Sequence, residues 1–166
     1  MSLSTSLKRT EEVNKHKTTA MKSLFEDSSY KEIKSRIEAL TPDHKPLWGK
    51  MNVGQMVTHC QFPFKVALSS KVRKTPWNPI PLMFKKSLYS DKPWRKNLPT
   101  VKVARIKDQR DLAAEKVKLL SMVDAFYEKR DQQEWLPHPM FGHFTVEQWG
   151  KLEYKHLDHH LTQFGV

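Results

Sequence analysis

Apolar residues recur at three- and four-residue steps in four stretches of this chain, a spacing typical of helices that bury one face. These stretches predict helices from a cap at Ser28 or Ser29 to about Leu40, from about 53 to 70, from a cap at Asp108 to about Arg130, and from a cap at Thr145 to about Phe164. No stretch of any length alternates apolar and polar residues. The predicted fold class is therefore all-α, a bundle of four principal helices.

Local signals mark where two of these helices begin. The spacing of a capping box occurs at two pairs of residues, Asn52 with Gln55 and Thr145 with Gln148. Pro63 interrupts the second helix, and since proline has no N–H, the carbonyl of His59 loses its usual helical partner. We expect a kink at this point that aims the imidazole of His59 inward.

The segments outside these helices set the domain boundaries. A short helix is predicted over 82–89, an extended piece over 101–106 and a turn-rich connection over 134–142. Residues 1–22 are polar and almost without large apolar side chains, so we expect a disordered basic tail. The 166 residues suffice for one domain with its own core, which we assign to residues 23–166.

The net charge of +11 is unevenly distributed. Residues 51–110 contain 13 Lys or Arg and 2 Asp or Glu, and the prolines and aromatic residues among them are typical of a long connection. We interpret the basic segment 71–110 as a solvated crossover. The alternative, which composition favours less, is a rim that faces a phosphate, a carboxylate or nucleic acid.

Cysteine content and hydropathy bear on the compartment. The only cysteine, Cys60, allows no internal disulfide and no Cys-x-x-Cys site, so a reducing compartment is expected. No apolar run approaches the about 20 residues of a membrane span, and the first 20 residues lack the apolar run of a signal peptide. We therefore expect a cytoplasmic protein. Cys60 lies within the apolar stripe of its helix, which favours a small core residue over a reactive thiol.

Three of the eight histidines lie in one turn of the last helix, in the sequence His156-Leu-Asp-His159-His160. With about 3.6 residues per turn, His156 and His160 face the core, whereas His159 lies on the flank. Glu153 and Gln163 share the inward face with the pair. An all-apolar core would not place two imidazoles, a carboxylate and an amide there, so this face is the candidate site.

The spacing of the inward pair suits metal binding. Residues four apart on a helix have Cβ atoms about 5–6 Å apart, so His156 and His160 can bind one ion, with His59 from the second helix as third ligand. Three neutral imidazoles leave a coordination position open, which is typical of catalytic sites. We expect a divalent metal, zinc or nickel, with iron also compatible. In the alternative interpretation the histidines are hydrogen-bonded core residues, because a His-x-x-x-His pair is common by chance.

The order of the two histidine-bearing helices along the chain resembles that of a known superfamily. The early helix with Met51-Asn-Val-Gly-Gln-Met-Val-Thr-His59 and the last helix with His156-x₃-His160-x₂-Gln163 resemble the DinB/YfiT-like metalloenzymes. The stretches His138-Pro-Met-Phe-Gly142 and Thr145-Val-Glu-Gln-Trp149 resemble a branch catalogued only as a domain of unknown function. The resemblance, over about residues 25–166, implies a four-helix bundle with long crossover connections and a divalent metal held by His59, His156 and His160 at one end of a cleft.

The resemblance also implies a reaction class. Characterised members include thiol-dependent transferases that use bacillithiol or mycothiol, and isomerases of thiol adducts. We therefore expect a metal-dependent transferase or hydrolase acting on a small molecule, in which the metal lowers the pKa of a bound thiol or water. Glu153 and Gln163 would orient the rings or relay a proton, and segment 71–110 would neutralise an acidic cosubstrate. A homodimer is compatible with an apolar bundle face.

Two other classes of function stay open. The first is a non-catalytic, stress-related or nucleic-acid-associated binding protein that uses segment 71–110, although only its charge favours nucleic acid as a partner. The second is a di-metal carboxylate bundle, which Glu153-x-x-His156 supports but which needs a second Glu-x-x-His motif that the chain lacks. His138, between Pro137 and Pro139, is a candidate cleft residue.

Overall fold

The fold is known from a computed structural model that describes residues 21–72 and 79–166. Nearly all of the predicted tail, residues 1–22, lies outside the described residues, and so does the part of the basic segment at 73–78. The described residues form five α-helices and no β-strand. The helices are α2 (Asp27–Ala39), α3 (Val53–Ala67), α4 (Ile80–Tyr89), α5 (Leu112–Tyr127) and α6 (Val146–Gln163). The predicted all-helical class is therefore confirmed.

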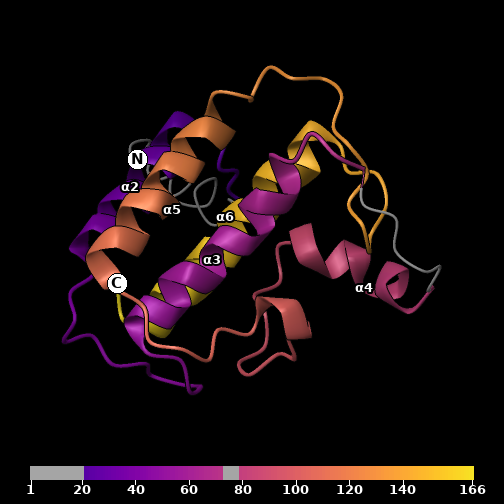
Figure 1. The fold of residues 1–166 in the computed structure, drawn as a ribbon. Coiled ribbons are helices and arrows are strands. Elements are labelled where there is room, and N and C mark those ends of the chain that lie inside the picture. Colours follow the sequence, from indigo (N-terminus) through magenta and orange to yellow (C-terminus); the bar gives the residue numbers. More distant parts are fainter. Residues whose placement is uncertain (1–20, 73–78) are drawn as a thin grey trace, which may run out of the picture.

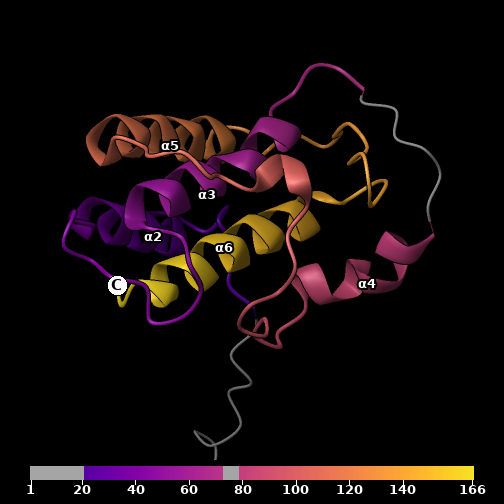
Figure 2. The ribbon, with the colours of Figure 1, turned by 60° about the horizontal axis from the view of Figure 1, so that its bottom comes forward.

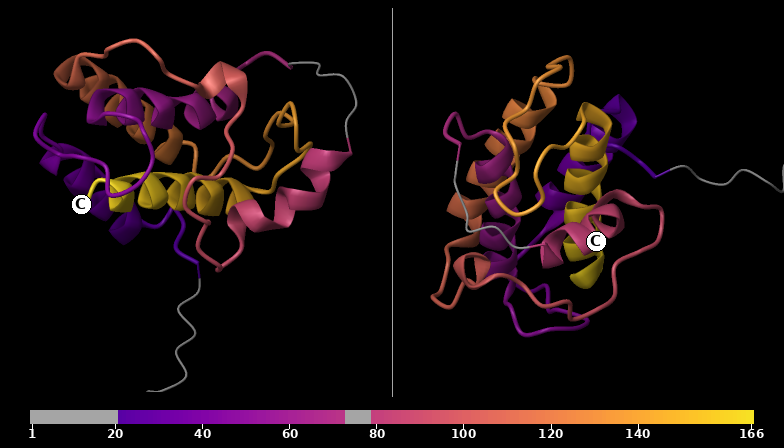
Figure 3. Two further views of the ribbon diagram at one scale, coloured as in Figure 1. Left: turned by 90° about the horizontal axis from the view of Figure 1, so that it is seen from below. Right: turned by 90° about the vertical axis from the view of Figure 1, so that its right-hand side faces the viewer.

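Four of these helices pack around a common core. α3 and α2 each contact both α5 and α6, so every helix of the four has two neighbours. Figures 1 and 2 show α3 and α6 side by side and antiparallel. α4 packs on α6 and projects from one side of the other helices (Figure 3).

The core consists of apolar side chains from all four packed helices. The side chains with almost no exposed surface include Ile33, Ile37, Met56, Phe64, Leu119, Phe126, Trp149, Leu157 and Leu161. Each such burial contributes about 1.5–3 kcal/mol to stability before entropy is counted. In the described part of the chain, no helix combines the length and the apolar character that crossing a bilayer requires.

Both predicted capping boxes are confirmed. The Asn52 side chain accepts from the backbone N–H of Gln55 at 2.9 Å, and the Gln55 side chain accepts from the N–H of Asn52 at 3.0 Å. Thr145 and Gln148 make the same reciprocal pair at the start of α6. These bonds satisfy N–H groups that have no partner within the helix, which fixes where α3 and α6 begin. α3 continues through Pro63 and ends at Ala67, and the kink expected there stays a prediction.

Three other boundaries differ from the sequence prediction. α5 is capped by Asp111, whose side chain accepts from the N–H of Ala113 at 3.0 Å, whereas Asp108 pairs with Arg110. α2 begins at Asp27, and Ser29 lies inside it, donating to Glu26 at 3.1 Å. The segment expected to be extended contains a 3₁₀ helix, η1 (Lys102–Ala104). For α2 and α5 several nearby polar residues could cap the helix, and tertiary packing decides among them.

Candidate metal centre

Three histidines from two helices meet in the core. α3 supplies His59, and α6, which runs antiparallel beside it, supplies His156 and His160 one turn apart (Figure 2). The three side chains are buried, and each offers a ring nitrogen within 4.8 Å of the others. The structure therefore brings together the three residues that sequence spacing selected, in an arrangement compatible with a metal site.

The orientation of His59 follows from one hydrogen bond. Its Nδ1 lies 2.8 Å from the carbonyl oxygen of Ala104 in η1. A carbonyl oxygen can only accept, so Nδ1 carries the proton and Nε2 keeps its lone pair. That Nε2 lies 3.2 Å from Nε2 of His156. η1 thus acts as a support for the imidazole, a role that sequence reasoning missed because a backbone acceptor has no residue signature.

His160 is oriented by a side-chain amide. Its Nδ1 lies 2.8 Å from Oε1 of Gln163, whose Nε2 donates to the carbonyl oxygen of Trp48 at 2.6 Å. The second bond fixes which end of the amide faces the ring, so Nδ1 of His160 donates and Nε2 keeps its lone pair. A Cβ on Gly49 would come within 2.7 Å of the Gln163 amide, and its φ of +84° also favours glycine. The loop at 48–49 is therefore shaped around this amide.

The third histidine lacks such a support. Nδ1 of His156 is buried and has no hydrogen-bond partner in the described part of the chain. The other buried side-chain atoms without a partner there are Nε1 of Trp149 and both carboxyl oxygens of Glu153. All three residues lie on the inward face of α6 at steps of four and three residues. Unpaired buried polar groups are costly, so this stripe requires an unseen partner such as internal water.

Burial governs the charge of the cluster. It lowers the pKa of His59, lowers that of His160 to about 3 and holds that of His156 well below its usual value, where the neighbouring histidines lower it further. The three rings are therefore neutral near pH 7, the state in which imidazole binds a metal. Burial also raises the pKa of the Glu153 carboxyl well above its ordinary value. Glu153 is accordingly a neutral acid inside the core.

A pocket of about 360 Å³ lies on the outer side of α6, and none of the three clustered histidines is among its lining residues. Trp48 and Trp94 form part of its wall, and His159, half-buried as expected for the helix flank, lies between them with ring centroids 5.7 Å from each. The Trp94 ring also contacts His156 at 5.8 Å. The indole of Trp94 thus separates the pocket from the buried cluster. Trp94 belongs to the basic segment and was not singled out by the sequence pattern.

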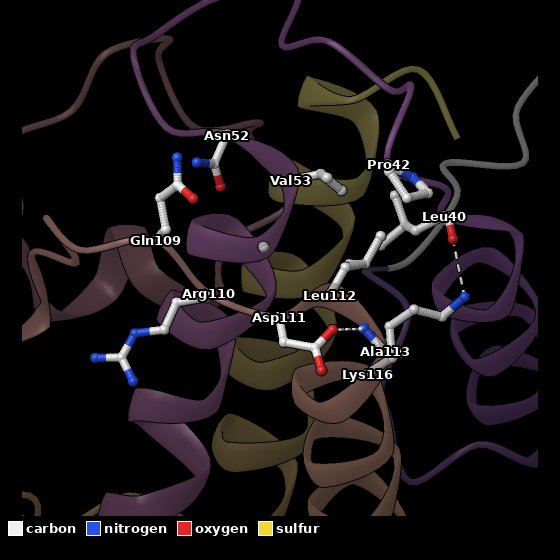
Figure 4. A pocket seen from close by; sticks show the side chains of 11 residues that line it. Leu40, Pro42, Asn52, Val53, Gln109, Arg110, Asp111, Leu112, Ala113 and Lys116 are labelled. Atoms are coloured by element: carbon white, nitrogen blue, oxygen red, sulfur yellow. Dashed lines mark hydrogen bonds between the residues drawn. The ribbon is translucent and has the colours of Figure 1, made fainter.

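A larger pocket of about 570 Å³ lies elsewhere, where α3 and α5 begin (Figure 4). Asn52 and Asp111, which line it, cap α3 and α5. Lys116 donates to the carbonyl oxygen of Leu40 at 2.9 Å, and Asp111 accepts from Ala113. Figure 4 shows the Arg110 side chain directed away from these groups. No histidine lines this pocket, whereas Trp94 in the wall of the smaller one contacts His156, so the smaller one is the better candidate for a substrate.

Two further residues considered from sequence have structural roles. Cys60 is fully buried and burial raises the pKa of its thiol, which agrees with a core residue rather than a reactive nucleophile. Nδ1 of His138 accepts from the backbone N–H groups of Met140 and Phe141, at 3.1 and 3.3 Å. His138 therefore stabilises the turn before α6, and it is not among the residues that line either pocket.

Comparison with known proteins assigns the chain to a family. No curated protein and no solved structure is significantly similar to the chain. A family model covers nearly the whole domain, from the residues just before α2 to the end of α6. It includes His59, His156 and His160, and the family has no assigned function. The chain belongs to this family, described as Protein of unknown function (DUF1569), which matches residues 20–165.

Proposed function

We propose that this protein is a divalent-metal-dependent enzyme whose ligands are His59, His156 and His160. The observation that carries the proposal is the meeting of three buried, neutral imidazoles with ring nitrogens within 4.8 Å of one another. Two of them keep the lone pair of Nε2 available for a metal because their Nδ1 atoms donate elsewhere. The DinB/YfiT-like assignment expected from the sequence is part of this proposal.

The donor set fits a divalent ion. Two nitrogens bound to one zinc ion at about 2.0–2.1 Å with tetrahedral angles are about 3.3 Å apart, and the Nε2 atoms of His59 and His156 lie 3.2 Å apart. Without a cation, Nε2 of His156 must carry a proton to avoid facing another lone pair, which leaves its buried Nδ1 as an acceptor without a donor. With a cation the proton is on Nδ1, and water or the Glu153 carboxyl, which lies on the same helix face, would accept it.

The pocket lined by Trp48 and Trp94 would hold the substrate, and the Trp94 indole, which lies between this pocket and His156, would have to move aside for the substrate to reach the ion. A divalent ion would supply Lewis acidity to a small-molecule ligand such as a thiol or water. Lys155 is 3 % exposed, and its ammonium donates to the carbonyl oxygens of Ser87 and Ser90 at 2.7 Å each. Burial lowers the pKa of Lys155 to about 8, so most of the side chain is still charged at pH 7.

These charges indicate the substrate class. Nζ of Lys96 lies 4.7 Å from the Trp48 ring centroid, and that of Lys155 lies 5.6 Å from the Trp94 centroid. Lys22 also lines the pocket, together with Asp91 and Asp158, so lysines outnumber aspartates beside the two indole walls. This favours a small molecule with an apolar body and a carboxylate or phosphate. The reaction we propose is transfer to, or hydrolysis of, such a molecule, with a low-molecular-weight thiol as the preferred cosubstrate. Zinc and nickel suit the three imidazoles best, and iron is compatible.

Turnover by metal-loaded protein tests this function. Protein reconstituted with Zn²⁺ or Ni²⁺ is incubated with a low-molecular-weight thiol and an aryl halide bearing a carboxylate, and thiol loss is followed, with an aryl ester as the hydrolysis substrate. We expect a rate above that of free metal, lost in His156→Ala and kept in His143→Ala, a histidine outside the cluster. Metal binding without turnover on either substrate would contradict the enzymatic proposal.

A further inference from the structure

α4 presents apolar side chains to solvent on its outer face. Ile80, Met83 and Phe84 recur at helical spacing and are 59 %, 79 % and 59 % exposed, and Leu82, on another side of the helix, is 47 % exposed. A surface helix ordinarily turns such a stripe toward the core. α4 has the reverse arrangement, so its outer face requires an explanation other than folding.

Contacts on the other side of α4 fix this orientation. Tyr89, opposite Ile80 on the helix, is partly buried against the core and meets the Phe144 ring edge to face, with centroids 6.1 Å apart. Lys155 of α6 donates to the carbonyl oxygens of Ser87 and Ser90 at the end of the helix. Rotation of α4 that buries its apolar stripe would break these contacts. The stripe is therefore held outward.

The surroundings of α4 are strongly basic. Segment 71–110 contains 12 Lys or Arg and 2 Asp or Glu. The Trp94 indole donates to the carbonyl oxygen of Ser87 at 3.0 Å, which brings the following loop back to the end of α4. Lys86, Lys92 and Arg95 are exposed, and within the described residues none of them forms an ion pair.

We propose that α4 and the basic residues beside it bind the surface of an anionic lipid bilayer. An apolar stripe flanked by lysine and arginine is the arrangement of helices that lie in the membrane interface, with the apolar face among the acyl chains and the cations at the headgroups. A second copy of this face would bring like charges together, and nucleic acid would leave Met83 and Phe84 without partners. This inference is independent of the proposed metal site.

Vesicle flotation tests the proposal. Full-length protein is mixed with vesicles of phosphatidylcholine alone or with one quarter phosphatidylglycerol, at low and high salt. We expect binding to the anionic vesicles that weakens with salt. Met83→Glu and Phe84→Glu should each weaken it at least tenfold, and Lys86→Gln about fivefold. Val117→Glu is the matched control, since Val117 is 69 % exposed on α5, and it should leave binding unchanged.

Three results would overturn the proposal. The first is no vesicle binding by folded protein at low salt. The second is an equal loss in Val117→Glu, which would show a non-specific charge effect. The third is a Phe84→Glu variant that binds vesicles as the wild type does while losing self-association or duplex DNA binding, which would assign the face to a second copy or to nucleic acid. Far-ultraviolet circular dichroism confirms that each variant is folded.

Discussion

The side chain of Gln163 connects a histidine to the loop that closes one side of the pocket. Its Oε1 accepts from His160 and its Nε2 donates to the Trp48 carbonyl. Removal of a group that holds a ligating histidine in one tautomer typically lowers metal affinity about 10–100-fold. Gln163 should therefore act through His160 as a positioning residue rather than as a ligand.

Replacement of Gln163 should weaken metal binding without removing it. In Gln163→Ala we expect Zn²⁺ affinity, measured by competition with a chelating dye, to fall about 10–100-fold. Gln163→Glu keeps an acceptor for Nδ1 and should retain most of the affinity. Gln133→Ala, which removes an exposed amide, is the control. An unchanged affinity in Gln163→Ala would show that the His160 tautomer does not depend on this amide.

The buried Glu153 carboxyl should make stability depend on pH. Because its folded-state pKa is raised, the unfolded chain loses this proton above about pH 4.5 and the folded chain retains it, so stability falls as pH rises, by at most about 1.4 kcal/mol per pH unit. The Gln side chain in Glu153→Gln cannot ionise, so this variant lacks the pH dependence of stability that the carboxyl causes. In urea unfolding of metal-free protein from pH 5 to 8, the free energy of unfolding of the variant should increase relative to that of the wild type as pH rises. Parallel curves would contradict a neutral buried acid.

His138 should produce the opposite dependence in acid. Burial, and then the charge of nearby Lys85, lowers its pKa to about 4, so between about pH 6.5 and 4 the unfolded chain takes up a proton that the folded chain does not. Stability is present above this window and is lost as pH falls through it, by up to about 3 kcal/mol. His138→Asn keeps an acceptor for the turn and should lose less stability over this window in urea unfolding. If the stability of the variant falls with pH as steeply as that of the wild type, His138 is not the cause of the acid dependence.

At the scale of elements, the capping residues predicted where a helix begins if only one residue could serve as the cap. Asn52 and Thr145 each have the matching glutamine three residues on, and α3 and α6 begin as expected. At α5 two aspartates precede the apolar stripe, and the one next to Leu112 is the cap. η1 could not be predicted, because the bond from His59 to its last carbonyl depends on a contact across 45 residues.

Loss of the N-terminal cap of α6, Thr145, should lower stability but leave metal affinity almost unchanged. Thr145→Ala removes the acceptor for the Gln148 N–H, which should lower the free energy of unfolding by about 1 kcal/mol. The ligands lie more than two turns from this end, so metal affinity should stay within about twofold of the wild type. Thr100→Ala, in an exposed loop, is the control in chemical denaturation. A large loss of metal affinity would contradict this prediction and show that the cap at the start of α6 affects the ligands near its other end.

For the whole molecule, sequence reasoning predicted the class of fold and the side chains that gather in the core. His156 and His160 followed from helical spacing, and His59 from its position on the neighbouring helix. The supports and walls of the site come from Ala104 in η1 and from the loop residues Trp48 and Trp94, and such contacts leave no periodic signal in the sequence. The DinB/YfiT-like relationship, the cytoplasmic location and the homodimer stay predictions.

Metal content is the measurement that tests the central claim most directly. Untagged protein prepared without chelators, and again after reconstitution, is analysed for zinc, nickel and iron by elemental analysis. We predict about one ion per chain in the wild type and in His159→Ala, and a loss of that ion in His59→Ala and His156→Ala. A wild type without metal after reconstitution, or an equal loss in His159→Ala, would contradict the three-histidine site and identify these rings as hydrogen-bonded core residues.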